Sequence, residues 1–236
     1  MDRLAKIVCT LGPASSSKAV IKKLIRAGMN VARLNFSHGT HASHLEMIRL
    51  IRECVSETGI PVAILQDLQG PKLRVGQLPN EGVMLPAGAV VKLYMAGEET
   101  ADYDGNEVAL PLDVPNLSRA VRPGNRILLD DGKLELQVTR VIGRSVETRV
   151  ILGGVLMSHK GVNLPGTDLG IDRFTEKDRT DLEFGLANRV DFVAISFVES
   201  EKDIKHVRDL IQQLAPARKN TPIIAKLERP AAVKNL

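Results

Sequence analysis

The feature that most constrains the fold is a repeat of short apolar strands and amphipathic helices, interrupted once by a long segment of different character. Predicted strands begin at residues 6, 31 and 62, and then at 191 and 222. Intervals of 25 and 31 residues suit one strand and one helix, whereas the interval of 129 residues leaves a surplus of about 95–100. Strand–helix–strand units with short connections form parallel sheets. The repeat therefore predicts a parallel α/β sheet that contains an inserted domain.

The elements of the repeat follow from β-branched runs and from the helical spacing of apolar side chains. Val20, Ile21 and Leu24 share one helix face, and Gly28 is a typical helix end. Thr175 begins a Thr-x-x-Asp capping pattern. The expected strands are 6–11, 31–36, 62–67, 191–195 and 222–227, and the expected helices are 17–27, 41–57, 175–187 and 200–214.

The surplus segment, residues 74–165, is predicted to form a small all-β domain. It is rich in Gly and Pro, and Asp131-Gly132 predicts a hairpin turn between strands at 126–129 and 134–142. Gly- and Pro-containing junctions flank it. Residues 1–73 and 166–236 then form the two parts of one α/β domain.

The strand spacing favours a truncated (β/α)8 TIM-type barrel with about five of its eight strands. A complete barrel needs about 250 residues, and about 140 remain here outside the insert. Residues 232–236 resemble the start of a further helix. An open five-stranded α/β sheet is the structural alternative.

Composition excludes several classes of protein. The net charge of +4 is small, the basic residues are scattered, and aromatic residues make up 3% of the chain, which argues against a nucleic-acid partner. The sequence has no apolar run of about 20 residues, as a membrane-spanning helix requires. Cys9 and Cys54 are expected to be reduced, buried thiols. The chain is therefore expected to be cytoplasmic.

Polar side chains gather at the carboxyl ends of the predicted strands, where (β/α) barrels place their chemistry. Alternation along a strand puts Arg33, Asn35 and Ser37 on one face. Arginine and lysine can hold a phosphoryl group, and a glutamate can hold a divalent metal beside it. The other polar residues at strand ends are Asp67, Ser196, Lys226 and Glu228.

Four of the five histidines, namely His41, His44, His159 and His206, offer no defensible metal site. His41 and His44 lie three residues apart at the start of a helix, which predicts a solvated helix face. His159 and His206 lack partners at metal-ligand spacing.

Several long segments match one family pattern in order: KIVCTLGPASSS, GMNVARLNFSHG, LQDLQGPKLRVG, ILLDDGKL, KGVNLPG, EKDRTDLEFGL, VAISFV and IIAKLE. With these segments, the chain resembles the pyruvate kinase family over essentially its whole length. The resemblance implies phosphoryl transfer from phosphoenolpyruvate to ADP, which gives pyruvate and ATP in glycolysis. It also implies that the β insert is a mobile lid over the active site.

The resemblance also implies roles for individual residues. Arg33 resembles the arginine that contacts the transferring phosphoryl group, and Lys226 the lysine that stabilises negative charge during transfer. Glu228 matches a ligand of Mg²⁺ or Mn²⁺. Asn35, Ser37 and Asp67 match the monovalent-cation site. The resemblance places His38, Arg74, Lys160, Asp131 and Ser196 on the substrate and nucleotide side.

One position of the resemblance concerns potassium. Family members with glutamate after Gly-Pro depend on K⁺, whereas members with lysine there do not. Here Lys72 follows Gly70-Pro71. An ammonium group has the same charge as K⁺ and can replace it, so K⁺ is not expected to be required.

The chain also departs from the family pattern. The second acidic metal ligand and the threonine linked to proton transfer have no counterpart among these 236 residues. We therefore expect the chain alone to turn over phosphoenolpyruvate poorly, and its open sheet edges to favour aggregation. The family is usually homotetrameric. The alternatives are a non-catalytic half-barrel and another phosphoenolpyruvate-handling barrel enzyme.

Overall fold

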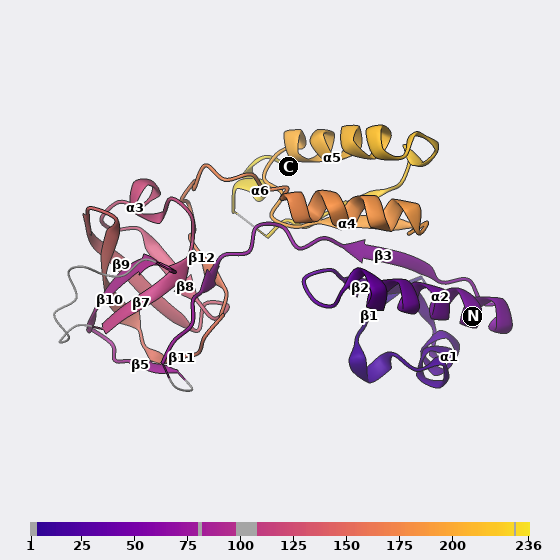
Figure 1. The fold of residues 1–236 in the computed structure, drawn as a ribbon, viewed down its shortest axis with the longest axis horizontal. Coiled ribbons are helices and arrows are strands. Elements are labelled where there is room, and N and C mark those ends of the chain that lie inside the picture. Colours follow the sequence, from indigo (N-terminus) through magenta and orange to yellow (C-terminus); the bar gives the residue numbers. More distant parts are fainter. Residues whose placement is uncertain (1–3, 80–81, 98–107, 229) are drawn as a thin grey trace. The chain divides into compact units, whose positions relative to one another are not determined.

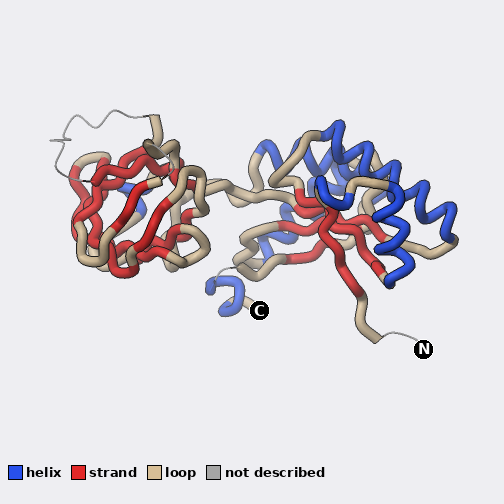
Figure 2. The backbone as a smooth tube through the Cα atoms, turned by 90° about the horizontal axis from the view of Figure 1, so that it is seen from below, coloured by secondary structure: helices blue, strands red, loops and turns tan. Residues whose placement is uncertain are grey.

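The computed structural model describes residues 4–79, 82–97, 108–228 and 230–236. The chain divides into two compact units (Figure 1): one comprises Met1–Gly70 and Arg173–Leu236, and the other comprises Pro71–Asp172. Helices and strands alternate in the first unit, whereas the second consists mainly of strands (Figure 2). The second unit is longer at both ends than the expected insert of residues 74–165. Leu73 and Leu169, outside the expected boundaries, bury their side chains in its core.

The first unit contains a five-stranded parallel sheet whose strands follow one another in chain order. This sequential order is that of a (β/α) barrel, whereas a doubly wound open sheet reverses its order at a switch point. The five expected strands are confirmed, with ends shifted by up to two residues. They are β1 (Ile7–Leu11), β2 (Met29–Asn35), β3 (Ala63–Asp67), β13 (Phe192–Ile195) and β14 (Ile223–Ala225).

The helices of the first unit begin and end at the residues that the sequence indicates. Ser17 accepts a hydrogen bond from the Val20 backbone N–H, and Thr175 forms a capping box with Asp178. Gly28 has a φ of 108°, a left-handed conformation that suits glycine at a helix end. The helices are α1 (Lys18–Ala27), α2 (His41–Thr58), α4 (Glu176–Ala187), α5 (Glu201–Leu214) and the short α6 (Pro230–Lys234).

Helices α1, α2, α4 and α5 cover one face of the sheet. Their buried residues share a single core with every second residue of the strands, among them Ala32, Leu34 and Ile64. Arg33 and Asn35 alternate with these residues and so belong to the opposite face. One helix layer on a sequentially ordered sheet is the arrangement of a partial barrel. The free thiol of Cys54 is buried in this core, and that of Cys9 is half-buried.

The second unit has its own hydrophobic core and two sheets. Among the described residues, seven of its strands form one sheet in the order β12-β8-β9-β10-β6-β7-β4, and β11 pairs with β5 in the other. The predicted hairpin is confirmed, because β8 and β9 are antiparallel neighbours with Leu129 opposite Leu134. The elements are β4 (Arg74–Val75), β5 (Val83–Leu85), β6 (Val90–Met95), β7 (Val108–Asp113), α3 (Leu117–Ala120), β8 (Arg126–Leu129), β9 (Leu134–Ile142), β10 (Ser145–Leu152), β11 (Gly154–Leu156) and β12 (Val162–Asn163).

Within the described ranges, β1 and β14 are the outer strands of the parallel sheet. Val8 on β1 is 53% exposed, and Ile224 on β14 is 41% exposed. Exposed apolar side chains on outer strands favour association between copies. They agree with the expected aggregation of the chain, which stays a prediction. In the part of the chain that the structure describes, no helix has both the length and the apolar character needed to cross a membrane.

A close backbone approach at Gly153 gives a test of the second unit's packing. A Cβ at this position would collide with the Leu85 carbonyl oxygen and would lie 2.8 Å from the Ala87 backbone nitrogen. Because backbone atoms cannot rotate away, we expect Gly153→Ala to lower the free energy of unfolding by about 2 kcal/mol or more. Urea denaturation measures this loss.

Gly161 provides the matched control within the same unit. A Cβ there would meet its nearest atom, an Asp131 side-chain oxygen, at 3.9 Å, which is ordinary van der Waals contact. Gly161→Ala should therefore change stability by less than about 0.5 kcal/mol. Equal losses in the two variants would contradict the packing argument.

Candidate active site

The site centres on Asp67, a buried carboxylate at the carboxyl end of β3 that is 1% exposed. Arg33 Nε on β2 donates a hydrogen bond of 2.7 Å to Asp67 Oδ2. Lys226 Nζ, one residue beyond β14, lies 3.0 Å from Asp67 Oδ1. The sheet therefore brings together three charged side chains that the sequence singles out at three strand ends.

Two cations of this cluster face the single buried carboxylate of Asp67. A buried carboxylate needs compensation, and Arg33 and Lys226 supply two cations for one anion. Thr10 Oγ1 accepts a 2.8 Å hydrogen bond from Arg33 Nη1, which fixes the guanidinium plane. The side chains of Arg33 and Lys226 are 29% and 27% exposed, so their charged ends remain partly accessible. The arrangement suits a bound anion.

Glu228 lies next to this positive pair. Its Oε2 accepts a 3.1 Å hydrogen bond from the Phe197 backbone N–H, and its Oε1 lies 3.5 Å from Lys226 Nζ. Mg²⁺ needs six oxygens, and it commonly takes one or two carboxylates together with water and substrate phosphates. Glu228 fits that role of a single protein carboxylate. Across the described ranges, no three His, Cys, Asp or Glu residues form a metal-binding group.

Asn35 is the last residue of β2, and Ser37 follows it in the β2–α2 loop. Asn35 is aligned with Asp67 in the β2–β3 register, and Asn35 Oδ1 accepts a 3.0 Å hydrogen bond from the Ser37 backbone N–H. Asp67 Oδ1 faces Lys226 but accepts no well-aligned hydrogen bond from the residues that the structure describes. Asn35 Oδ1 and Asp67 Oδ1 therefore have the capacity to contact a cation in addition to the Lys226 ammonium.

A cavity of about 390 Å³ opens at the ends of β1 and β2. Its lining includes Asn35 at the end of β2 and His38 from the β2–α2 loop, together with Gly12 and Pro13 after β1. The His38 side chain is exposed. The cavity thus adjoins the residue that the resemblance places on the nucleotide side.

Ser196 holds the segment that follows β3. Its hydroxyl donates a 2.7 Å hydrogen bond to the Leu68 carbonyl, and the residue is 8% exposed. At the end of this segment Gly70 has a φ of +70°, and a Cβ there would lie 2.9 Å from the Phe197 ring. The hydroxyl proton of Ser196 is thus committed to the backbone, although its oxygen can still accept a hydrogen bond.

The remaining predicted residues belong to the second unit. Lys160 Nζ lies 3.0 Å from Asp130 Oδ1, and Lys133 Nζ lies 3.0 Å from Asp130 Oδ2. Lys133, and secondly Lys160, lower the pKa of Asp130 below its usual value. Asp130, rather than the singled-out Asp131, is therefore the carboxylate that pairs with Lys160. Arg74 begins β4, and the exposed Lys72 precedes it by two residues.

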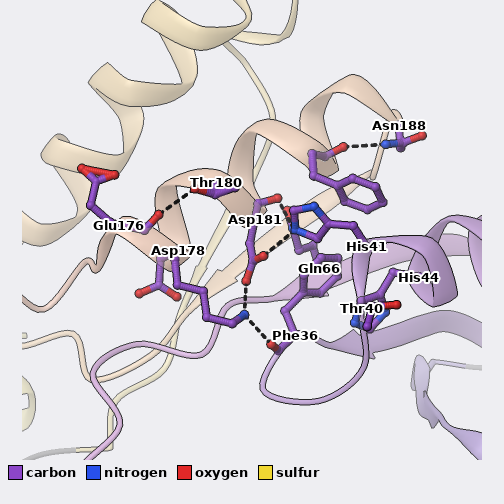
Figure 3. Close-up of polar contacts among 12 residues, drawn as sticks. Phe36, Thr40, His41, His44, Gln66, Glu176, Asp178, Thr180, Asp181 and Asn188 are labelled. Atoms are coloured by element: carbon purple, nitrogen blue, oxygen red, sulfur yellow. Dashed lines mark hydrogen bonds and ion pairs between the residues drawn. The ribbon is translucent and has the colours of Figure 1, made fainter.

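The interpretation of His41 and His44 as a solvated helix face is wrong (Figure 3). His41 Nε2 lies 2.7 Å from Asp181 Oδ1 on α4. The His44 ring stacks on Phe36 with centroids 4.0 Å apart, and burial lowers the pKa of His44. His41 and Asp181 are 140 residues apart in sequence, so no local pattern could pair them. The sequence does contain one related signal: Lys177 and Asp181 are four residues apart, which predicts an ion pair on one face of α4.

The fold and this cluster define a (β/α) barrel protein with an inserted β domain and an anion-attracting site at its strand ends. The family model "Pyruvate kinase, barrel domain" matches residues 2–236, so the chain belongs to the pyruvate kinase family. It is 46% identical over its whole length to "Pyruvate kinase 2" of Synechocystis, and 41% identical to a pyruvate kinase of Corynebacterium glutamicum. It is 40% identical, over 98% of its length, to a pyruvate kinase of Thermococcus litoralis.

The chain spans less than half the length of these relatives. The matched regions make up 39% of the Synechocystis protein, 48% of the Corynebacterium protein and 47% of the Thermococcus protein. The similarity therefore concerns the barrel domain with its insert.

The role of Asp67 as the compensating anion can be tested by removing its charge. Asp67→Asn leaves Arg33 and Lys226 facing each other without a carboxylate between them. We expect the free energy of unfolding to fall by about 3 kcal/mol, as when one partner of a buried ion pair is removed. Urea denaturation with circular dichroism detection measures this loss.

Glu201→Gln is the control for loss of a carboxylate charge. Glu201 pairs with Lys205 on the surface of α5, where their side chains are 76% and 69% exposed. Its removal should cost less than about 1 kcal/mol. A similarly small loss for Asp67→Asn would refute the assigned role of the buried carboxylate.

Proposed function

We propose that this chain provides the phosphoenolpyruvate- and metal-binding part of a pyruvate kinase active site. The reaction is transfer of the phosphoryl group from phosphoenolpyruvate to ADP, with pyruvate and ATP as products. The main support is the convergence of Arg33 and Lys226 on Asp67, with Glu228 beside Lys226. These groups offer positive charge to a phosphoryl group and an oxygen ligand to a divalent ion.

Each residue of the cluster has a distinct proposed role. The Arg33 guanidinium contacts the phosphoryl oxygens, because its fixed fork of N–H donors suits a phosphate. The Lys226 ammonium stabilises negative charge on the moving phosphoryl group and on the enolate. Glu228 is the protein ligand of Mg²⁺ or Mn²⁺, which when bound neutralises charge on phosphate and carboxylate oxygens.

The nucleotide side is proposed from His38 and from the second unit. The cavity beside His38 is of a size that binds small organic ligands. Arg74 and Lys160 would contact the nucleotide phosphates, and Asp131 would lie near them in the turn after β8. Ser196 would face the substrate while it holds the Leu68 carbonyl. Cytoplasmic localisation and a homotetramer follow from the resemblance to the family.

Phosphoenolpyruvate binding tests the proposal directly. Isothermal titration calorimetry in the presence of Mn²⁺ should detect binding by the chain. Lys226→Met removes one of the two cations of the site, so we expect the affinity to fall at least about tenfold. Lys205→Met removes a lysine from an exposed ion pair on α5 and should leave the affinity unchanged.

Two results would overturn the proposal. One is the absence of phosphoenolpyruvate binding by the folded wild-type chain at millimolar concentration. The other is an equal affinity in wild type and Lys226→Met. A coupled lactate dehydrogenase assay on the same samples measures turnover, which the sequence predicts to be poor.

We also propose that Lys72 replaces the monovalent cation near Asn35, Ser37 and Asp67. The ammonium of the exposed Lys72 has the same charge as K⁺ and can take its place near these oxygens. In buffer with tetramethylammonium as the only monovalent cation, added K⁺ should therefore leave phosphoenolpyruvate affinity within about twofold. Lys72→Glu should create a dependence on K⁺. A large gain in wild-type affinity on addition of K⁺ would disprove the replacement.

A further inference from the structure

The peptide group between Phe36 and Ser37 is held at both of its polar ends. Lys177 Nζ donates a 2.9 Å hydrogen bond to the Phe36 carbonyl oxygen. The N–H of the same peptide, on Ser37, donates a 3.0 Å hydrogen bond to Asn35 Oδ1. A cation at the carbonyl polarises the peptide and strengthens the hydrogen bond at its N–H. Lys177 therefore acts through one peptide group on the side-chain oxygen of Asn35.

Asp181 holds Lys177 in place. Its Oδ2 lies 2.5 Å from Lys177 Nζ, and its Oδ1 lies 2.7 Å from His41 Nε2. Asp181 is 3% exposed, so these two partners replace the water that its carboxylate loses on folding. Its backbone carbonyl accepts a 2.6 Å hydrogen bond from the buried Gln66 on β3. The carboxylate is thus fixed relative to the sheet.

Two further contacts hold the same loop. The Phe36 N–H donates a 2.9 Å hydrogen bond to the Asp67 carbonyl, which ties the loop to the end of β3. His44 Nε2 lies 2.8 Å from the His38 carbonyl oxygen while its ring stacks on Phe36. Burial favours neutral His44, and a neutral imidazole with Nε2 protonated can donate this hydrogen bond. Contacts from β3, α2 and α4 therefore converge on residues 36–38.

We propose that Lys177 and Asp181 are positioning residues that hold Asn35 and Ser37 in the geometry required for phosphoenolpyruvate binding. The inference rests on the proposed function, which places Asn35 and Ser37 at the monovalent-cation position beside the phosphoryl site. Lys177 lies on the helix side of the sheet, and it acts through the Phe36–Ser37 peptide without contacting the substrate. Its ammonium keeps the β2–α2 loop in one conformation before the substrate arrives, and this preorganisation raises the affinity.

The test compares Lys177→Met with Lys177→Arg in the full chain. Methionine keeps the length of the stem but cannot donate, whereas arginine can bond both the Asp181 carboxylate and the Phe36 carbonyl. We expect amide hydrogen exchange at Ser37, followed by NMR, to be about tenfold faster in Lys177→Met. Phosphoenolpyruvate affinity should fall about threefold to tenfold. Lys177→Arg should restore both quantities to within about twofold of wild type.

Lys205→Met is the matched control, because Lys205 also pairs with a carboxylate four residues away, on α5. It removes a helical ion pair without touching the β2–α2 loop, and it should leave both readouts unchanged. The melting temperature of each variant reports whether the fold is intact. Asp181→Asn is a second variant, and it should speed Ser37 exchange because it loosens Lys177.

The two readouts separate this proposal from the proposed function. Unchanged Ser37 exchange in Lys177→Met overturns the positioning role, and so does an equal effect in Lys205→Met. Unchanged phosphoenolpyruvate affinity despite faster exchange also overturns it. Failure of the wild-type chain to bind phosphoenolpyruvate overturns the proposed function, and with it the role in substrate binding. Faster exchange that arginine reverses, together with weaker binding, supports the proposal.

Discussion

The buried carboxylate of Asp67 sets the register of the parallel sheet. Arg33 on the adjacent strand and Lys226 beyond β14 both reach it, and these contacts need β2, β3 and β14 in their observed alignment. A shift of β3 by one residue would turn Asp67 toward the helices. There its charge would meet the apolar core around Ile64 and Leu186, without a cation. The polar cluster that forms the candidate site therefore also selects one pairing of the strands.

The sequence predicts features that depend on local patterns. The five strands, the ends of α1, α2 and α4 and the hairpin after β8 follow from period, caps and turn residues within short windows. Arg33, Asp67 and Lys226 could be singled out because strand ends converge in a parallel sheet. The pairing of His41 with Asp181 was missed, because 140 residues separate them. Lys160 pairs with Asp130 in the turn after β8, where Asp130 and Asp131 both have left-handed backbone. The residue types alone do not indicate which of these two neighbouring carboxylates faces the lysine.

The insertion leaves the sheet at a point that the first unit holds firmly. The Gly70 N–H donates a 2.9 Å hydrogen bond to Asp178 Oδ1 on α4, and Ser196 holds the Leu68 carbonyl. The first and second units then bury separate cores. An insert that contains its own core leaves the strand and helix pattern around it unchanged, which is why the βα repeat resumes at residue 173. Fixing the exit at Gly70 helps to keep Asp67, three residues earlier, in contact with Arg33 and Lys226.

Helix α4 holds both the segment that leaves β3 and the loop that leaves β2. It does so through two buried carboxylates three residues apart. Asp178 accepts hydrogen bonds from Gly70 and Thr175, whereas Asp181 pairs with Lys177 and His41. Asp178 lies in the first turn of the helix, where the helix dipole favours negative charge. One carboxylate fixes the chain that leaves β3, and the other fixes the loop that leaves β2. These two segments flank Asn35 and Asp67, so a helix on the far side of the sheet determines the geometry of the candidate site. Apolar packing alone could hold α4 against the sheet, but only directional hydrogen bonds can set the orientation of individual peptide groups.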